Sequence, residues 1–122
     1  MSTIDAAGGA TLSTHVLDTS LGAPAAGVRV WLEAIAPDGS SSPMATGVSD
    51  GDGRLRDFAG TIPTLPAGTY RLRFDIGAYF RATNREGFFP EVVIVFRVTS
   101  GTSHYHIPLL VSPFGYTTYR GS

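Results

Sequence analysis

The chain contains no cysteine, no long apolar run and no excess of either charge, and each absence removes a class of protein. Without cysteine, no disulfide framework, thiolate nucleophile or zinc finger can be proposed. No stretch approaches the ~18 apolar residues that a membrane-spanning helix needs. Nine basic and ten acidic residues, with no run of either sign, argue against nucleic acid and anionic membranes as principal partners.

The two ends of the chain carry no recognisable targeting signal. Residues 1–9 have neither a basic patch nor an apolar core, so they do not form a secretory signal. The last three residues differ from the usual peroxisomal tripeptide. We therefore expect a flexible lead over residues 1–10, one domain over residues 11–122 and a cytoplasmic location, which also fits the cysteine-free composition.

Glycine and proline punctuate the chain and set the expected fold class. Fifteen glycines and eight prolines separate β-branched and aromatic runs, and no window shows a clean helical period. The pattern predicts an all-β fold, a sandwich of two antiparallel sheets with one short helix. Residues 37–43 are expected to form a surface turn. Strands are expected at 11–18, 28–35, 55–58, 68–75, 91–98, 104–111 and 116–120, and one or two helical turns at 76–84.

One predicted strand is apolar on both faces. Val93 and Val95 lie on the face opposite to the alternating residues 92, 94, 96 and 98, which are also apolar. A two-layer sandwich buries only one face of each strand, so the second apolar face needs another cover. The economical interpretation is a subunit interface.

The C-terminal residues carry an unusual amount of chemistry. In the predicted strand 104–111, His104 and His106 share one face, whereas Tyr105 and Ile107 share the other. A turn at 112–115 then predicts that the chain returns beside this strand. The tail from Tyr119 onwards is therefore expected to pack within the fold.

Three histidines and one arginine are candidates for chemistry. His15 lies within the predicted strand 11–18, and Arg54 directly follows a glycine-rich turn. An imidazole titrates near neutrality and can take a proton from water, and a guanidinium is permanently cationic and planar. Each residue could instead be structural. His104, His106 and His15 could also bind zinc with water in the open position, although no carboxylate is obviously placed to orient them.

Two segments resemble the signatures of the transthyretin family. The first is residues 15–30 (HVLDTSLGAPAAGVRV) and the second is residues 104–118 (HYHIPLLVSPFGYTT). Shorter matches at 53–54, 68–70, 74–80 and 88–91 follow the family's order, so the resemblance covers about residues 11–122. The departures are the longer N-terminal lead and a serine-rich loop at 39–42.

Within this family the chain resembles the enzymes that hydrolyse 5-hydroxyisourate rather than the vertebrate thyroid-hormone carriers. The carriers have lysine at the position of His15, no histidine at that of His106 and a different ending, whereas this chain ends in Tyr-Arg-Gly-Ser. The resemblance implies hydrolysis of 5-hydroxyisourate to 2-oxo-4-hydroxy-4-carboxy-5-ureidoimidazoline, a step in urate degradation toward allantoin. The reaction would proceed by histidine-assisted attack of water on a ring amide.

The resemblance also implies the site and the assembly. It implies a homotetramer, a dimer of dimers with sites at the dimer–dimer interface, that acts on a small purine-derived substrate without metal or cofactor. The residues implied are His15, Arg54, His106 and Ser122 in catalysis, and His15, Arg54, Tyr119, Arg120 and Gly121 in substrate binding.

The sequence leaves several alternatives open. Either His15 or His106 could be the general base. A carrier of small aromatic ligands would keep the same channel without turnover, and a zinc hydrolase would use the same histidines differently. A purely structural tetramer is a third alternative.

Overall fold

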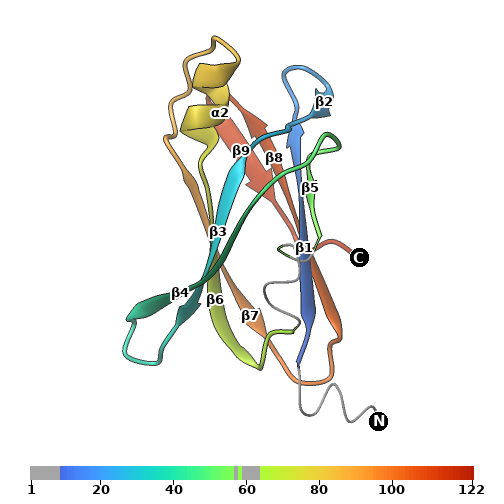
Figure 1. The fold of residues 1–122 in the computed structure, drawn as a ribbon, viewed down its shortest axis with the longest axis vertical. Coiled ribbons are helices and arrows are strands. Elements are labelled where there is room, and N and C mark those ends of the chain that lie inside the picture. Colours follow the sequence, from blue (N-terminus) through green and yellow to red (C-terminus); the bar gives the residue numbers. More distant parts are fainter. Residues whose placement is uncertain (1–8, 57, 59–63) are drawn as a thin grey trace.

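The structure, a computed structural model, describes residues 9–56, 58 and 64–122. Two β-sheets face each other across one apolar core, which confirms the predicted all-β sandwich (Figure 1). The described elements are β1 (Thr11–Asp18), β2 (Ala23–Pro24), β3 (Arg29–Ile35), β4 (Ser41–Val48), β5 (Arg54–Leu55), β6 (Gly68–Phe74), α2 (Ile76–Ala82), β7 (Val92–Val98), β8 (His104–Ser112) and β9 (Gly115–Thr118).

One pair of strands in the sandwich is parallel. The first sheet has the order β2-β1-β8-β9, with β5 also paired to β1, and the second has the order β4-β3-β6-β7. The described strands pair antiparallel except for β1 and β8, which run parallel. Antiparallel sheets were expected, and this parallel pair was not foreseen because alternation defines the faces of a strand but not its direction.

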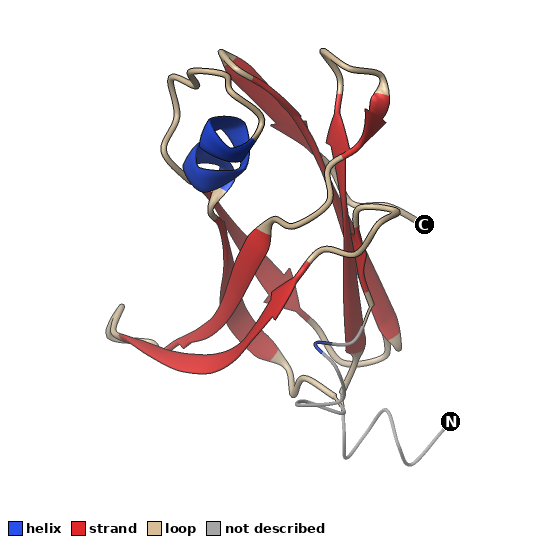
Figure 2. Ribbon diagram, turned by 45° about the horizontal axis from the view of Figure 1, so that its top comes forward, coloured by secondary structure: helices blue, strands red, loops and turns tan. Residues whose placement is uncertain are grey.

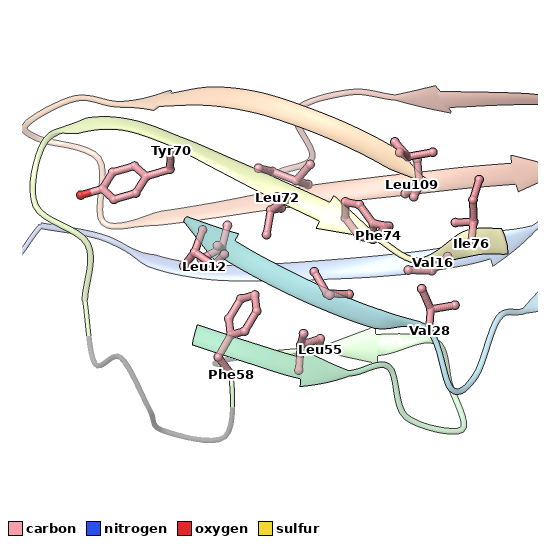
Figure 3. Packing of buried hydrophobic residues seen from close by; sticks show 14 of the residues in the cluster. Leu12, Val16, Val28, Leu55, Phe58, Tyr70, Leu72, Phe74, Ile76 and Leu109 are labelled. Atoms are coloured by element: carbon pink, nitrogen blue, oxygen red, sulfur yellow. The ribbon is translucent and has the colours of Figure 1, made fainter. Parts of the chain in front are cut away.

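Alternation along each strand separates the core from the outer faces. In β1, Leu12 and Val16 are buried, whereas Ser13 and His15 are only partly buried on the opposite face. Figure 3 shows β1 side chains packed against residues of the other sheet such as Leu72. Each fully buried aliphatic or aromatic side chain contributes about 1.5–3 kcal/mol relative to its exposed state. The core therefore fixes which face of β1 and β8 is left for chemistry.

The predicted surface turn at 37–43 was wrong over its second half. Residues 41–48 form β4, which among the described strands pairs only with β3 and is an edge strand. Its Ser-Ser-Pro beginning has low strand propensity, but an edge strand tolerates Pro43 because one side of its backbone needs no partner. The register shifts between Leu32 and Glu33, opposite this proline.

Three predicted boundaries also differ from the structure. β5 spans two residues instead of 55–58, of which residue 57 lies outside the described residues. β9 ends at Thr118 and not at Arg120. Ala10, assigned to the flexible lead, is buried and exchanges backbone hydrogen bonds of 2.8 and 2.6 Å with Leu65. The ordered domain therefore includes Ala10, and the rest of the lead up to residue 8 lies outside the described residues.

The helix α2 closes one end of the sandwich and confirms the expected helical turns at 76–84 (Figure 2). Asp75 caps its N-terminus by accepting a hydrogen bond of 3.1 Å from the Ala78 N–H. From the helix, the Tyr79 hydroxyl donates at 2.8 Å to Asp18, the last residue of β1. This contact ties the helix to the strand that carries His15.

β7 is the other edge of the second sheet and exposes apolar side chains. Val93 is 42% exposed and Val95 is 60% exposed in the isolated chain. The predicted second apolar face of this strand is therefore present and uncovered. Within the described residues, no helix is both long and apolar enough to cross a membrane.

Candidate active site

The parallel register of β1 and β8 brings two rows of polar side chains together. Thr11 lies opposite His104 and Ser13 lies opposite His106. Because side chains alternate along both strands, these four residues share the face of the sheet that points away from the core. The tail of the chain returns to this face, and its end lies beside β1 and β5 (Figure 1).

A cavity of about 290 Å³ opens on this face. Its size is at the lower end of the range for small-molecule sites. It contains three of the four residues for which the sequence predicted a catalytic role, Arg54, His106 and Ser122. The lining residues are Ser13, Thr14, Arg54, Arg56, His104, His106 and Ser122.

A tight turn delivers Arg54 next to His15. Asp50 accepts hydrogen bonds of 2.9 Å from the N–H groups of Asp52 and Arg54, which hold residues 50–54 in a compact loop. Gly53 has a positive φ of 76°, and a Cβ there would collide with the Val16 carbonyl oxygen. The turn can therefore lie directly against β1, where Arg54 pairs with His15.

The tautomer of neutral His15 follows from its hydrogen bond. Its Nε2 lies 2.8 Å from the carbonyl oxygen of Asp52. Since a carbonyl can only accept, Nε2 carries the proton and Nδ1 is left as the acceptor. His15 does not line the 290 Å³ cavity but lies beside it, near enough to His106 to affect its titration.

The surroundings of His106 disfavour its protonated form. Burial lowers its pKa below the ordinary histidine value, and repulsion from Arg54 and from the protonated forms of His15 and His104 lowers the pKa further. Its Nδ1 lies 2.8 Å from the Ser13 hydroxyl. A neutral imidazole next to a guanidinium can accept a proton from water while the cation attracts developing negative charge.

The tail splits between two places. The Gly121 N–H donates to the His106 carbonyl oxygen at 2.7 Å, and Ser122 lines the cavity. Tyr119 and Arg120, however, line a second, mainly apolar cavity of about 320 Å³ near β7. The Arg120 guanidinium lies 4.8 Å from the centroid of the Tyr105 ring. In the single chain the four tail residues therefore lie at two places, and their expected gathering around one site at a subunit interface stays a prediction.

Sequence reasoning missed part of this site. Ser13, Thr14, Arg56 and the alignment of His104 with Thr11 were not singled out for chemistry. Ser13 stands two residues before His15, and Arg56 stands two residues after Arg54. Because residues two apart on a strand share a face, this spacing could have indicated that Ser13 and Arg56 lie on the same face as the candidates already found. The contacts of Ser13 with β8 depend on the parallel register, which that spacing does not give.

The donor geometry does not support the zinc alternative. Among the described residues, no three histidine, aspartate or glutamate side chains are grouped so that they could hold a metal ion. His104 uses both ring nitrogens, Nδ1 at 2.6 Å from the Thr11 hydroxyl and Nε2 at 3.1 Å from the Ser13 hydroxyl.

Comparisons with known proteins show which proteins the chain is similar to. The chain is 42% identical over 116 residues to a probable 5-hydroxyisourate hydrolase of Schizosaccharomyces pombe, covering 93% of each protein. It is also 42% identical to the 5-hydroxyisourate hydrolase of Mus musculus, covering 91% of this chain and 94% of the mouse protein.

Solved structures give the same result for the fold. The Klebsiella pneumoniae 5-hydroxyisourate hydrolase matches with a TM-score of 0.81 and 41% identity, over 93% of this chain and 99% of that one. Transthyretin from Sparus aurata matches with a TM-score of 0.81 and 34% identity, over 90% and 95%. The model of the HIUase/Transthyretin family matches residues 12–121, and the chain belongs to this family.

Proposed function

We propose that this protein hydrolyses 5-hydroxyisourate to 2-oxo-4-hydroxy-4-carboxy-5-ureidoimidazoline, a step in urate degradation toward allantoin. The observation that carries the proposal is the placement of His106, whose pKa is lowered by burial and neighbouring cations, in the same cavity as Arg54 and Arg56. The names of the relatives support the same substrate, since those from Schizosaccharomyces pombe, Mus musculus and Klebsiella pneumoniae are all called 5-hydroxyisourate hydrolases.

In the proposed reaction, His106 takes a proton from a water molecule whose oxygen attacks a ring amide carbonyl. Negative charge develops on the carbonyl oxygen, where the guanidinium of Arg54 stabilises it. The carbon–nitrogen bond of the amide then breaks, the ring opens, and the leaving nitrogen takes a proton. The products of this cleavage are a carboxylate and an N–H group.

Three further residues have supporting roles in the proposal. His15, whose Nε2–H is engaged by Asp52, binds a substrate heteroatom close to Arg54. The Ser122 hydroxyl, which lines the cavity, orients the attacking water. Gly121 keeps Ser122 on this face through its hydrogen bond to the His106 carbonyl.

We also propose that the active form is a homotetramer, a dimer of dimers with its sites at the dimer–dimer interface. The exposed apolar face of β7 supports an interface, because Val93 and Val95 otherwise remain in water. Tyr119 and Arg120 could then contribute to substrate binding from a neighbouring subunit. The cytoplasmic location expected from the sequence stays a prediction, which an N-terminal fluorescent fusion tests.

A carrier function is the second candidate, since sea bream transthyretin in complex with thyroxine matches with a TM-score of 0.81 at 34% identity. Turnover separates the two candidates. We would mix a small molar amount of protein with excess freshly generated 5-hydroxyisourate in ¹⁸O-labelled water and follow loss of substrate absorbance. A hydrolase consumes many equivalents and places ¹⁸O in the product carboxylate. Consumption no faster than in buffer would reject the hydrolase and leave the carrier.

A further inference from the structure

Four side chains on β1 and β8 form one continuous chain of hydrogen bonds. Thr11 Oγ1 lies 2.6 Å from His104 Nδ1, Ser13 Oγ lies 3.1 Å from His104 Nε2, and Ser13 Oγ lies 2.8 Å from His106 Nδ1. At its outer end, the Thr11 hydroxyl donates at 3.3 Å to the carbonyl oxygen of Ser103. The chain therefore links a backbone carbonyl at the surface to the imidazole in the cavity.

The direction of the Thr11–Ser103 contact, together with the donor capacity of each group, sets the position of every proton. The Thr11 hydroxyl has one proton, so donating to Ser103 leaves it to accept from His104 Nδ1–H. Neutral His104 then has a bare Nε2, which must accept from the Ser13 hydroxyl. Ser13 has no second proton, so it accepts from His106 Nδ1–H. With both rings neutral, this is the one arrangement that satisfies all four contacts.

The consequence for His106 is a defined tautomer. With its proton on Nδ1, its Nε2 has a free lone pair and can act as a base. We infer that Ser13 and His104 are positioning residues that set this tautomer and form a proton relay from His106 to the exposed His104. This inference rests on the proposed function for its catalytic part but on hydrogen-bond geometry for its tautomers.

The relay gains and loses the same number of protons over one catalytic cycle. When His106 Nε2 takes a proton from water, the Nδ1 proton passes to Ser13 Oγ, and the Ser13 proton passes to His104 Nε2. The positive charge then lies on His104, while His106 is neutral with its proton on Nε2. His106 gives that proton to the leaving nitrogen, and the two transfers along the relay reverse.

The location of the two histidines gives this relay a physical advantage. His106 is half-buried and lines a cavity with Arg54 and Arg56, so a positive charge there is disfavoured. His104 is exposed, and water stabilises an imidazolium at that position. Moving the charge along the relay converts His106 from base to acid and places the cation on His104, the more exposed of the two histidines that line the cavity.

The tautomers can be measured without substrate. Long-range ¹H–¹⁵N correlation spectra of ¹⁵N-histidine-labelled protein at pH 8 distinguish Nδ1–H from Nε2–H rings, and the chain has three histidines to assign. We expect Nδ1–H for His104 and His106 and Nε2–H for His15, which serves as the internal control. An Nε2–H tautomer at either His104 or His106 would overturn the inference, whether or not the protein hydrolyses 5-hydroxyisourate.

The kinetic test uses variants that interrupt the relay. Ser13→Ala should lower kcat about 10-fold or more with little change in KM, and Ser13→Thr should restore most of it, because the hydroxyl returns. Ser42→Ala, which removes an exposed hydroxyl from β4, is the matched control. Melting temperatures identify variants that fail to fold, for which the tautomer spectrum of the wild type remains decisive.

A double variant tests whether the two residues act as one unit. His104→Asn should also lower kcat, and Ser13→Ala combined with His104→Asn should be no slower than the slower single variant, since each change interrupts the same relay. Losses that multiply would contradict a shared relay. Absence of turnover in the wild type would instead reject the proposed function and leave the tautomer result to stand alone.

Discussion

Gly121 lies directly against the imidazole of His106. Its N–H donates to the His106 carbonyl oxygen at 2.7 Å, and a Cβ built on Gly121 would stand 2.6 Å from His106 Cδ2. No side chain fits at that distance without moving the ring. The C-terminal tail therefore fixes both the backbone and the ring position of a residue placed in the cavity.

Gly121→Ala should lower turnover by about 10²-fold, because a displacement of the ring by about 1 Å is enough to spoil a reactive geometry. The melting temperature should change little, since the tail adds little to the core. Initial rates and thermal unfolding measured together check both expectations. Gly115→Ala is the control, because a Cβ there would be 3.7 Å from its nearest neighbour, Ser112 Oγ. Full activity in Gly121→Ala would show that the contact does not position His106.

His106 should titrate below the ordinary histidine pKa of about 6.5. Burial is the main cause of this lowered pKa, followed by the charges of Arg54, His15 and His104, and Arg56 also lines the cavity. Arg54→Gln should therefore raise the midpoint of the His106 C2–H resonance in an NMR titration, whereas Arg29→Gln, an exposed change on β3, should not.

The sign of the pH effect follows from the same shift. A lowered native pKa means that the unfolded chain binds the proton first, so the contribution of His106 to stability is present above about pH 6.5 and is lost as pH falls through its native pKa. Turnover should decline over that acidic range as the base becomes protonated. A His106 midpoint at or above 6.5 would contradict the prediction.

Asp18 should be a main electrostatic support of the fold near the helix. Its buried carboxylate accepts hydrogen bonds from Tyr79, Arg85 and Ser20. Burial alone would raise its pKa, but these hydrogen bonds hold the pKa well below the usual range. Asp18→Ala leaves the donors unpaired and should lower the free energy of unfolding by about 2–4 kcal/mol in urea titrations at fixed protein concentration.

The matched control for Asp18 is Asp38→Ala, since Asp38 caps an exposed turn through Ser40 alone. The depressed carboxylate pKa also sets the pH window. The stabilisation by Asp18 is present above about pH 4 and is lost as pH falls through its native pKa. A wild type and Asp18→Ala that unfold alike at neutral pH would remove this role.

Val95→Glu should weaken the proposed assembly, because it places a charge on the exposed apolar face of β7. Sedimentation velocity at micromolar protein should show a tetramer for the wild type and smaller species for the variant. Val48→Glu changes a similarly exposed valine, 43% against 60% exposed, on the opposite edge of the same sheet and is the control. A stable, active wild-type monomer would reject the tetramer.

The sequence predicted those parts of the fold in which alternation is strong. β1, β6, β7 and β8 lie within a residue or two of their expected bounds, and the faces of β1 and β8 are as expected. β4 was missed because Ser41, Ser42 and Pro43 favour turns locally, and it forms because β3 offers it a partner. The conformation of residues 41–48 is therefore set by pairing with β3 and cannot be predicted from local propensity.

The candidate site was also predictable only in part from the sequence. Arg54, His106 and Ser122 could be found from residue type and family resemblance, and the cavity contains all three. Ser13 could not be given its role, because its contact with His106 depends on a parallel register between strands about ninety residues apart in sequence. The sequence also could not predict that Tyr119 and Arg120 line a different cavity from the one beside Gly121, since this depends on which way each side chain of the tail points.

The central claim is that His106, Arg54 and His15 carry out hydrolysis of 5-hydroxyisourate on the outer face of β1, β5 and β8. The most direct measurement is the initial rate of loss of freshly generated 5-hydroxyisourate with wild type, His106→Asn, His15→Asn and Arg54→Glu at equal concentration. The wild type should exceed the spontaneous rate by orders of magnitude, and each variant should lose at least ~10²-fold while remaining folded. A folded His106→Asn protein as fast as the wild type would contradict the account.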